Sequence, residues 1–178
     1  MNNYQENYIF DLQFRYNRKL NRYYEKHGKR KVLKLIIAIE VIETENRVLL
    51  WRICEYLSLV SVYIIHLFIN TPLINFSIGR FQIKLEHLFD VLNIKYFKYE
   101  KKLYLNKRIS PFRFIKVIQL SNKYYVVEDV LKIWFPQYDV DELTLKDLED
   151  ITLAYSGNDE WNGEINYFSV MKKLYFNL

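Results

Sequence analysis

The chain has little cysteine, proline or glycine, the residues that form disulfides or interrupt regular secondary structure. It holds one cysteine, three prolines and four glycines among 178 residues. A single cysteine excludes a disulfide within the chain. Scarce glycine and proline, with hydrophobic residues making up half of the composition, argue against disorder and against a turn-rich all-β protein. Three histidines do not form the Cys/His cluster that a structural zinc site needs, so we expect no metal ion and no cofactor.

The chain contains many residues of both charge signs, but they are unevenly distributed along the sequence. The formal net charge is +5, residues 1–34 and 95–123 are strongly basic, and residues 128–160 are acidic. Basic surfaces attract polyanions such as nucleic acid, anionic lipid and anionic cell-wall polymers. The sign of the charge does not choose among these partners, and a solvated basic face with no partner fits equally well.

The length and the hydrophobic periodicity predict an all-α protein, or an α protein with a minor β element. A chain of 178 residues fits a single domain, which we place over 1–178 with a basic N-terminal helix over 1–30. The region 96–105 is compatible with a helix or with a short strand. Caps and periodicity predict helices over 4–28, 31–45, 47–69, 84–92, 110–120, 126–135, 144–157 and 164–175.

The second of these helices, residues 31–45, is apolar on almost every side, which is typical of a buried helix. It carries three acids, Glu40, Glu43 and Glu45. Glu40 lies deepest in the apolar run and Glu45 lies closest to the polar loop. Glu43 shares a face with two isoleucines near the end of the helix. We favour Glu43 as a functional acid, although Arg47 at i+4 could pair with it and would oppose proton donation.

The next segment lacks charge altogether. No charged residue stands between Glu55 and Arg80, a stretch long enough in principle to span a bilayer. Pro72, His66 and several polar residues weaken that interpretation. We expect a buried helix followed by a loop, with membrane contact through 56–76 as the alternative. Cys54 stands among apolar residues, and we expect it to be buried and inert.

Two further segments share a pattern with the acid. One reads Ser77-Ile78-Gly79-Arg80-Phe81-Gln82-Ile83, and the other reads Ala154-Tyr155-Ser156-Gly157-Asn158. With Glu43 they resemble the lysozyme-like superfamily, particularly the lytic transglycosylases, which carry Glu…Ser-x-x-Gly-x-x-Gln-[IM]…Ala-Tyr-Asn. The resemblance extends over residues 32–175.

The resemblance implies cleavage of the β-1,4 bond between N-acetylmuramic acid and N-acetylglucosamine in peptidoglycan or a related glycan. Glu43 would act as general acid and then as base, because burial keeps a carboxyl protonated near neutral pH. Ser77, Gly79 and Gln82 would border the sugar cleft. The hydroxyl of Tyr155 would steer the proton of the acid.

The match departs from the family at the late tyrosine. Ser156 replaces the family's Asn, and Trp161-Asn162-Gly163 followed by Tyr167 offers a second register, with Asn162 as a substrate-binding residue. No second carboxylate of the two-acid lysozyme mechanism is identifiable. Lytic transglycosylases manage with one Glu, since the substrate's own acetamido group and 6-hydroxyl supply nucleophiles. Hydrolysis and transglycosylation therefore both remain open.

Two other interpretations stay beside the enzyme. A non-catalytic module could bind nucleic acid through the basic, Tyr-rich segments 4–34 and 95–123. A degenerate lysozyme-like fold could serve protein contacts alone. The polar N-terminus lacks the pattern of a signal peptide. A cell-wall enzyme made in the cytoplasm would then need release through a phage holin or a secretion machine. A cytoplasmic glycan as the target would remove that need.

Overall fold

The computed structural model describes residues 3–45, 49–139, 142–156, 160–161 and 165–176. Most of them are helical and a few form short strands, which confirms the all-α prediction with a minor β element. The chain divides into two compact units, which we describe separately. The first unit is Met1–Asn46 with Trp134–Leu178, and the second unit is Arg47–Ile133. We expected one domain over 1–178, which would include both units, and this stays a prediction.

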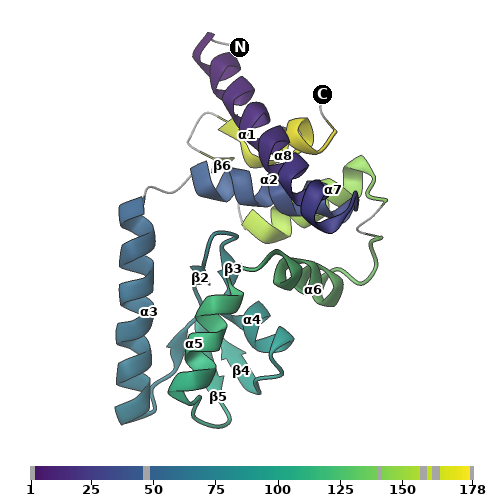
Figure 1. The fold of residues 1–178 in the computed structure, drawn as a ribbon. Coiled ribbons are helices and arrows are strands. Elements are labelled where there is room, and N and C mark those ends of the chain that lie inside the picture. The colour runs from purple at the N-terminus through teal and green to yellow at the C-terminus, as the bar shows by residue number, and fades with distance from the viewer. Residues whose placement is uncertain (1–2, 46–48, 140–141, 157–159, 162–164, 177–178) are drawn as a thin grey trace. The chain divides into compact units, whose positions relative to one another are not determined.

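The first unit is a cluster of helices around α2 (Val32–Glu45). Helices α1 (Asn3–His27) and α8 (Tyr167–Phe176) both pack on α2, and α7 (Leu145–Ser156) packs on α8 (Figure 1). Eleven of the 14 residues of α2 are buried, as its all-round apolar sequence predicted. The unit also has a short antiparallel hairpin of β6 (Glu160–Trp161) and β7 (Ile165–Asn166).

Local capping signals in the sequence predicted the start of α7. The hydroxyl and the backbone N–H of Thr144 both donate to Asp147 Oδ2, at 2.7 and 2.9 Å, and the Asp147 N–H donates back to Thr144 Oγ1 at 3.3 Å. These reciprocal bonds satisfy groups that a helix start leaves unpaired. The predicted stop at Gly157 lies outside the described residues.

The second unit packs helices with two small sheets. It begins with α3 (Leu49–Ile69). The antiparallel sheet β1-β5-β4 comprises β1 (Leu73–Ile74), β4 (Tyr96–Tyr99) and β5 (Lys102–Leu105), so the segment left open between helix and strand is a hairpin. A second hairpin joins β2 (Ser77–Ile78) to β3 (Ile83–Lys84). Helices α4 (Leu85–Val91), α5 (Pro111–Leu120) and α6 (Tyr124–Trp134) complete it (Figure 1).

Helix α3 forms where the sequence predicted a helix, but the expectation that it is buried is wrong. Only 17% of its window Leu50–Ile69 is buried, although by length and composition this helix could cross a membrane. Leu59 and Tyr63 face inward, where the Tyr63 hydroxyl donates to the Ile109 carbonyl at 3.0 Å. Cys54 is exposed, which corrects the expected buried thiol. An uncharged helix has the same sequence pattern whether protein covers it or not, so the pattern could not tell the two cases apart.

The half-buried His87 on α4 makes the stability of the second unit depend on pH. Burial lowers its pKa from 6.5 to about 4, an effect that Glu86 opposes and that Lys84 and Lys98 reinforce. Between these values the unfolded chain binds a proton that the folded chain does not. The stabilisation is therefore complete above pH 6.5 and is lost as the pH falls toward 4.

We expect the free energy of unfolding to fall by about 2 kcal/mol more in the native chain than in His87→Gln between pH 7 and pH 4.5. Urea unfolding at both pH values measures this difference. His27→Gln, on α1, is the matched control for replacing a histidine outside the second unit. Equal slopes for the native chain and His87→Gln would contradict the prediction.

Candidate functional site

Glu43 lies in the last turn of α2 with only 8% of its surface exposed. Tyr167, the first residue of α8, is also buried, and its hydroxyl donates to Glu43 Oε1 at 3.0 Å. The two residues are 124 positions apart in the chain, so the fold of the first unit brings them together. The pair places a carboxyl and a phenol side by side in an apolar setting.

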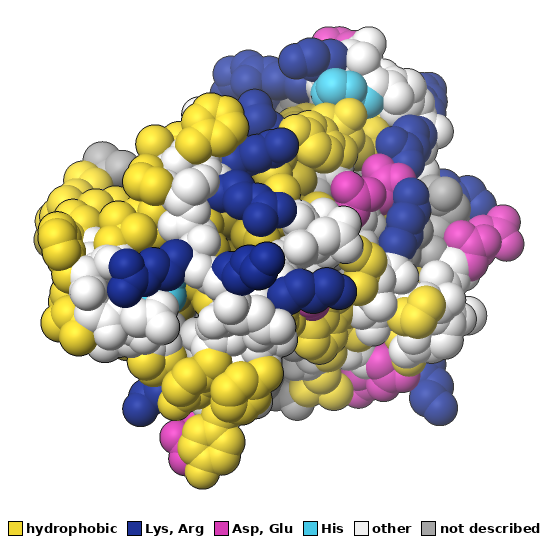
Figure 2. Space-filling model, turned by 90° about the horizontal axis from the view of Figure 1, so that it is seen from below, with side chains coloured by type: hydrophobic (Ala, Val, Ile, Leu, Met, Phe, Trp, Pro, Cys, Tyr) yellow, Lys and Arg dark blue, Asp and Glu magenta, His cyan; other side chains and the backbone are white. Residues whose placement is uncertain are grey.

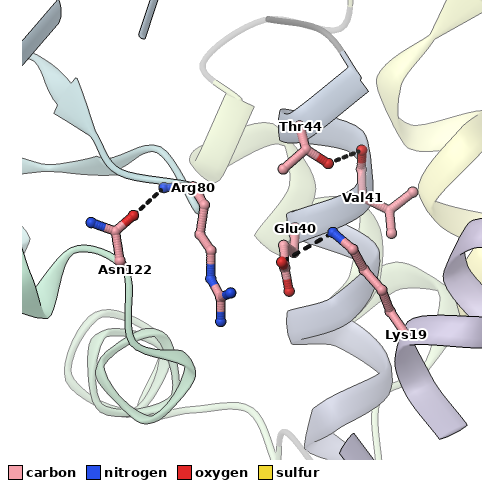
Figure 3. Close-up of polar contacts among 6 residues, drawn as sticks. All are labelled: Lys19, Glu40, Val41, Thr44, Arg80 and Asn122. Carbon is pink, nitrogen blue, oxygen red and sulfur yellow. Dashed lines mark hydrogen bonds and ion pairs between the residues drawn. The ribbon is translucent and has the colours of Figure 1, made fainter. Parts of the chain in front are cut away.

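The other two acids of α2 have cationic partners. Lys19 on α1 donates to Glu40 Oε1 at 3.0 Å (Figure 3), and Arg15 forms an ion pair with Glu45. Glu43 differs in that the hydrogen bond described for it comes from a tyrosine, which is the residue type that the resemblance places beside the acid.

Tyr167, which belongs to the second of the two predicted registers, donates to Glu43, whereas the side chain of Tyr155 lies outside the described part of the structure, so the choice between the registers stays a prediction. Tyr155 lies within α7, one residue before the end of that helix. Asn162 and Arg47 lie outside the described residues. Among the described side chains, the hydroxyl bonded to Glu43 is that of Tyr167, a residue that the sequence singled out only by its spacing from Trp161-Asn162-Gly163.

Tyr167→Phe tests how much this bond stabilises the first unit. The variant removes one hydrogen bond to a buried carboxyl, and we expect the free energy of unfolding to fall by about 1–3 kcal/mol. Urea unfolding followed by circular dichroism measures the loss. Tyr24→Phe, also in the first unit, removes a hydroxyl for which the described residues provide no hydrogen bond, and should change little. A loss as small as that of the control would show that the bond contributes little to stability.

The predicted Ser/Gln turn forms the β2–β3 hairpin of the second unit. Ile78 and Ile83 pair across it and both are fully buried. Gly79 has a φ of +79°, and a Cβ there would lie 2.6 Å from Ser121 Oγ and 2.8 Å from the Ser121 carbonyl carbon. The absence of a side chain at Gly79 thus lets the chain's own backbone at Ser121 approach closely. A role of Gly79 in sugar binding stays a prediction.

Asn122 also bonds this turn, and no pattern in the sequence indicated it. Its Oδ1 accepts the backbone N–H of Arg80 at 3.1 Å (Figure 3), and its Nδ2 donates to the Tyr56 hydroxyl at 3.0 Å. Asn122, which lies between α5 and α6, therefore connects the backbone of the turn to Tyr56 on α3.

Gln82 is buried, with a φ of +51°. Its Nε2 donates to the Gly79 carbonyl at 2.8 Å and to Glu55 Oε2 at 3.1 Å. Its Oε1 accepts no hydrogen bond among the residues that the structure describes. An acid does lie beside the glutamine, but it is Glu55 on α3. Glu43 belongs to the first unit and Gln82 to the second. That the two residues border one sugar cleft stays a prediction.

A pocket of about 350 Å³ opens beside Glu55 in the second unit. It combines an indole, a carboxylate and hydroxyl groups, a set that can stack on an apolar ring face and hydrogen-bond polar substituents. Ser77, a predicted cleft residue, is part of it. The lining consists of Trp51, Cys54, Glu55, Ser58, Val62, Ile74, Phe76 and Ser77.

The first unit has a basic groove of about 270 Å³ between α1 and α2. Val41 and Thr44 form its floor, where the Thr44 hydroxyl donates to the Val41 carbonyl at 3.0 Å (Figure 3). Two of its four cations are bound to Glu40 and Glu45. Such a groove can accept an anionic group. Binding of an anionic polymer, which the sequence predicted, stays a prediction. The cations are Arg15, Arg18, Lys19 and Arg22.

No group of three or more His, Cys, Asp or Glu side chains in the described part of the chain is arranged to hold a metal ion. No protein-family model matches the chain, and searches of curated proteins and of solved structures find no match either.

Proposed function

We propose that this chain cleaves the glycan strand of peptidoglycan, or of a related N-acetylated glycan, with Glu43 as the general acid and then the base. The observation that carries the proposal is the buried carboxyl of Glu43 at the end of an apolar helix, 3.0 Å from the hydroxyl of Tyr167. This is the acid–tyrosine combination that the resemblance to lytic transglycosylases implies.

Glu43 would first donate its proton to the glycosidic oxygen as the bond to the leaving sugar breaks. Burial favours the neutral form of a carboxyl, which is the form that this step needs. The Tyr167 hydroxyl holds Oε1 and so fixes the orientation of the acid. Glu43 would then take a proton from water, or from the substrate's own 6-hydroxyl, in the second step.

The pocket beside α3 would bind a sugar ring near the Ser/Gln turn. Trp51 offers an aromatic surface for the apolar face of the ring, while Glu55 and Ser77 accept or donate hydrogen bonds to its hydroxyls. A volume of about 350 Å³ falls in the range typical of small-ligand pockets.

The test is the release of soluble fragments from purified peptidoglycan by the native chain and by Glu43→Gln. Mass spectrometry of the fragments distinguishes a reducing sugar end, produced by hydrolysis, from a 1,6-anhydro end, produced by transglycosylation. A native chain that releases neither would overturn the proposal.

A non-catalytic binding role is the second candidate, and the basic groove of α1 favours it. Arg18 and Arg22 lie one helical turn apart on that groove. This role requires retention on DNA or RNA that weakens steeply with salt. Nucleic-acid retention by both the native chain and Glu43→Gln, together with inactivity of the native chain on peptidoglycan, would favour the binding role over cleavage.

A further inference from the structure

The outward face of α3 is a continuous apolar surface. Hydrophobic side chains gather over this helix at the left of Figure 2, bordered by Lys and Arg side chains. Phe68 is 80% exposed, which is far more than a core position allows. Soluble monomers rarely leave such a surface uncovered, so it indicates a partner. The exposed apolar residues are Leu50, Trp51, Ile53, Leu57, Val60, Ile64, Ile65, Phe68 and Ile69.

The shape of this face fits a lipid surface. At 100° per residue these positions cover about half of the helix circumference, and no charged residue interrupts them. A helix–helix seam uses a narrower stripe of apolar positions. The 21 residues of α3 measure about 31 Å, long enough to present an extended apolar strip.

The inner face of α3 favours a helix that lies along a lipid surface over a helix that crosses it. Arg52 and Glu55 stand on the inward side, and Glu55 is bonded to Gln82. His66 is buried, with its Nδ1 2.6 Å from the Thr71 carbonyl. A spanning helix would have to break these contacts and carry the charges into lipid, whereas an interfacial helix keeps them.

The charge of the second unit adds an electrostatic attraction to anionic lipid. Residues 47–133 hold 14 Lys and Arg against six Asp and Glu, a net +8 with neutral His, whereas the residues of the first unit sum to −3. Anionic membranes attract such a surface, by about 1 kcal/mol per basic residue near the headgroups. Two copies joined through α3 would bring two units of +8 together, so the charge opposes a second copy as the occupant.

We propose that the outward face of α3 docks this chain on an anionic lipid bilayer, with the helix lying in the interface. The inference goes beyond glycan cleavage and does not depend on it. It explains together the uncharged stretch of the sequence, the exposed apolar face and the concentration of positive charge in one unit.

Flotation of the full chain with lipid vesicles tests the proposal. We expect binding to vesicles of phosphatidylcholine with one quarter phosphatidylglycerol, and at least tenfold weaker binding to pure phosphatidylcholine. The double variant Ile65→Ser with Phe68→Ser should lose at least tenfold in binding. The matched control Phe10→Ser with Phe14→Ser removes two exposed aromatics of α1 and should bind like the native chain.

Trp51 gives a second readout, because it is exposed at the edge of the proposed docking face, where it also lines the pocket of the second unit. Its fluorescence, measured in a Trp134→Phe, Trp161→Phe background, should shift to shorter wavelength on anionic vesicles and be quenched by brominated lipid. Absence of both flotation and shift would overturn the proposal. So would a dimer in solution that the α3 double variant breaks, or a lowered melting temperature of that variant without any vesicle binding by the native chain.

Discussion

Glu43→Gln is expected to lose glycan-cleaving activity by about 10²–10⁴-fold while the chain keeps its helical structure. The amide cannot donate a proton to the glycosidic oxygen, so the general-acid step is lost. Its carbonyl oxygen can still accept the Tyr167 hydroxyl, which holds Glu43 Oε1 at 3.0 Å in the native chain. Loss of turbidity of cell walls and release of soluble fragments measure the activity, and far-ultraviolet circular dichroism measures the fold.

The other acids of α2 provide the matched controls. Glu40→Gln and Glu45→Gln each break one ion pair, with Lys19 and with Arg15, and leave the Glu43–Tyr167 pair in place. Both should keep activity within a few-fold of the native chain. Full activity in Glu43→Gln, with loss in one of the other two, would move the acid to that residue.

Gly79→Ala should destabilise the second unit by about 2–5 kcal/mol, more than a surface glycine would. Two effects add: a left-handed φ costs a side chain roughly 1–2 kcal/mol, and overpacking costs about 1–3 kcal/mol more. The overpacking arises because the new Cβ would lie 2.6 Å from Ser121 Oγ and 2.8 Å from the Ser121 carbonyl carbon. Urea unfolding of the full chain measures the change.

Gly28→Ala separates the two effects. Gly28 has the same φ of +79°, but nothing lies within 4 Å of a Cβ placed there. This control should therefore lose only about 1–2 kcal/mol. Equal losses at the two positions would mean that Ser121 moves away at little cost, and the turn would then be less tightly packed than described.

Local signals in the sequence were the dependable ones. Ser110 and Pro111 predicted the start of α5, where Ser110 Oγ accepts the Arg113 N–H at 3.3 Å. The apolar run before Glu43 predicted a buried helix and an acid near its end. These features depend on residues within a turn or two of each other, so a single sequence contains the information.

Contacts between distant segments were not predictable. Glu55 entered the sequence argument only as the last charged residue before the uncharged stretch, yet it bonds Gln82 and lines the pocket of the second unit. Asn122 carried no signal, although it holds the turn at Arg80. The exposure of α3 and of Cys54 was missed for the same reason, since periodicity reports which side of a helix is apolar and not what covers it.

The composition of the first unit from two separate stretches of chain has a consequence for synthesis. At 5–20 residues per second, a ribosome needs roughly 6–25 s to travel the 124 positions from Glu43 to Tyr167. During that interval α2 exists without α8, and its isoleucines face water or a chaperone. The second unit is synthesised completely in the meantime and can fold first. The first unit, which contains the first residues to be synthesised, therefore completes its fold last.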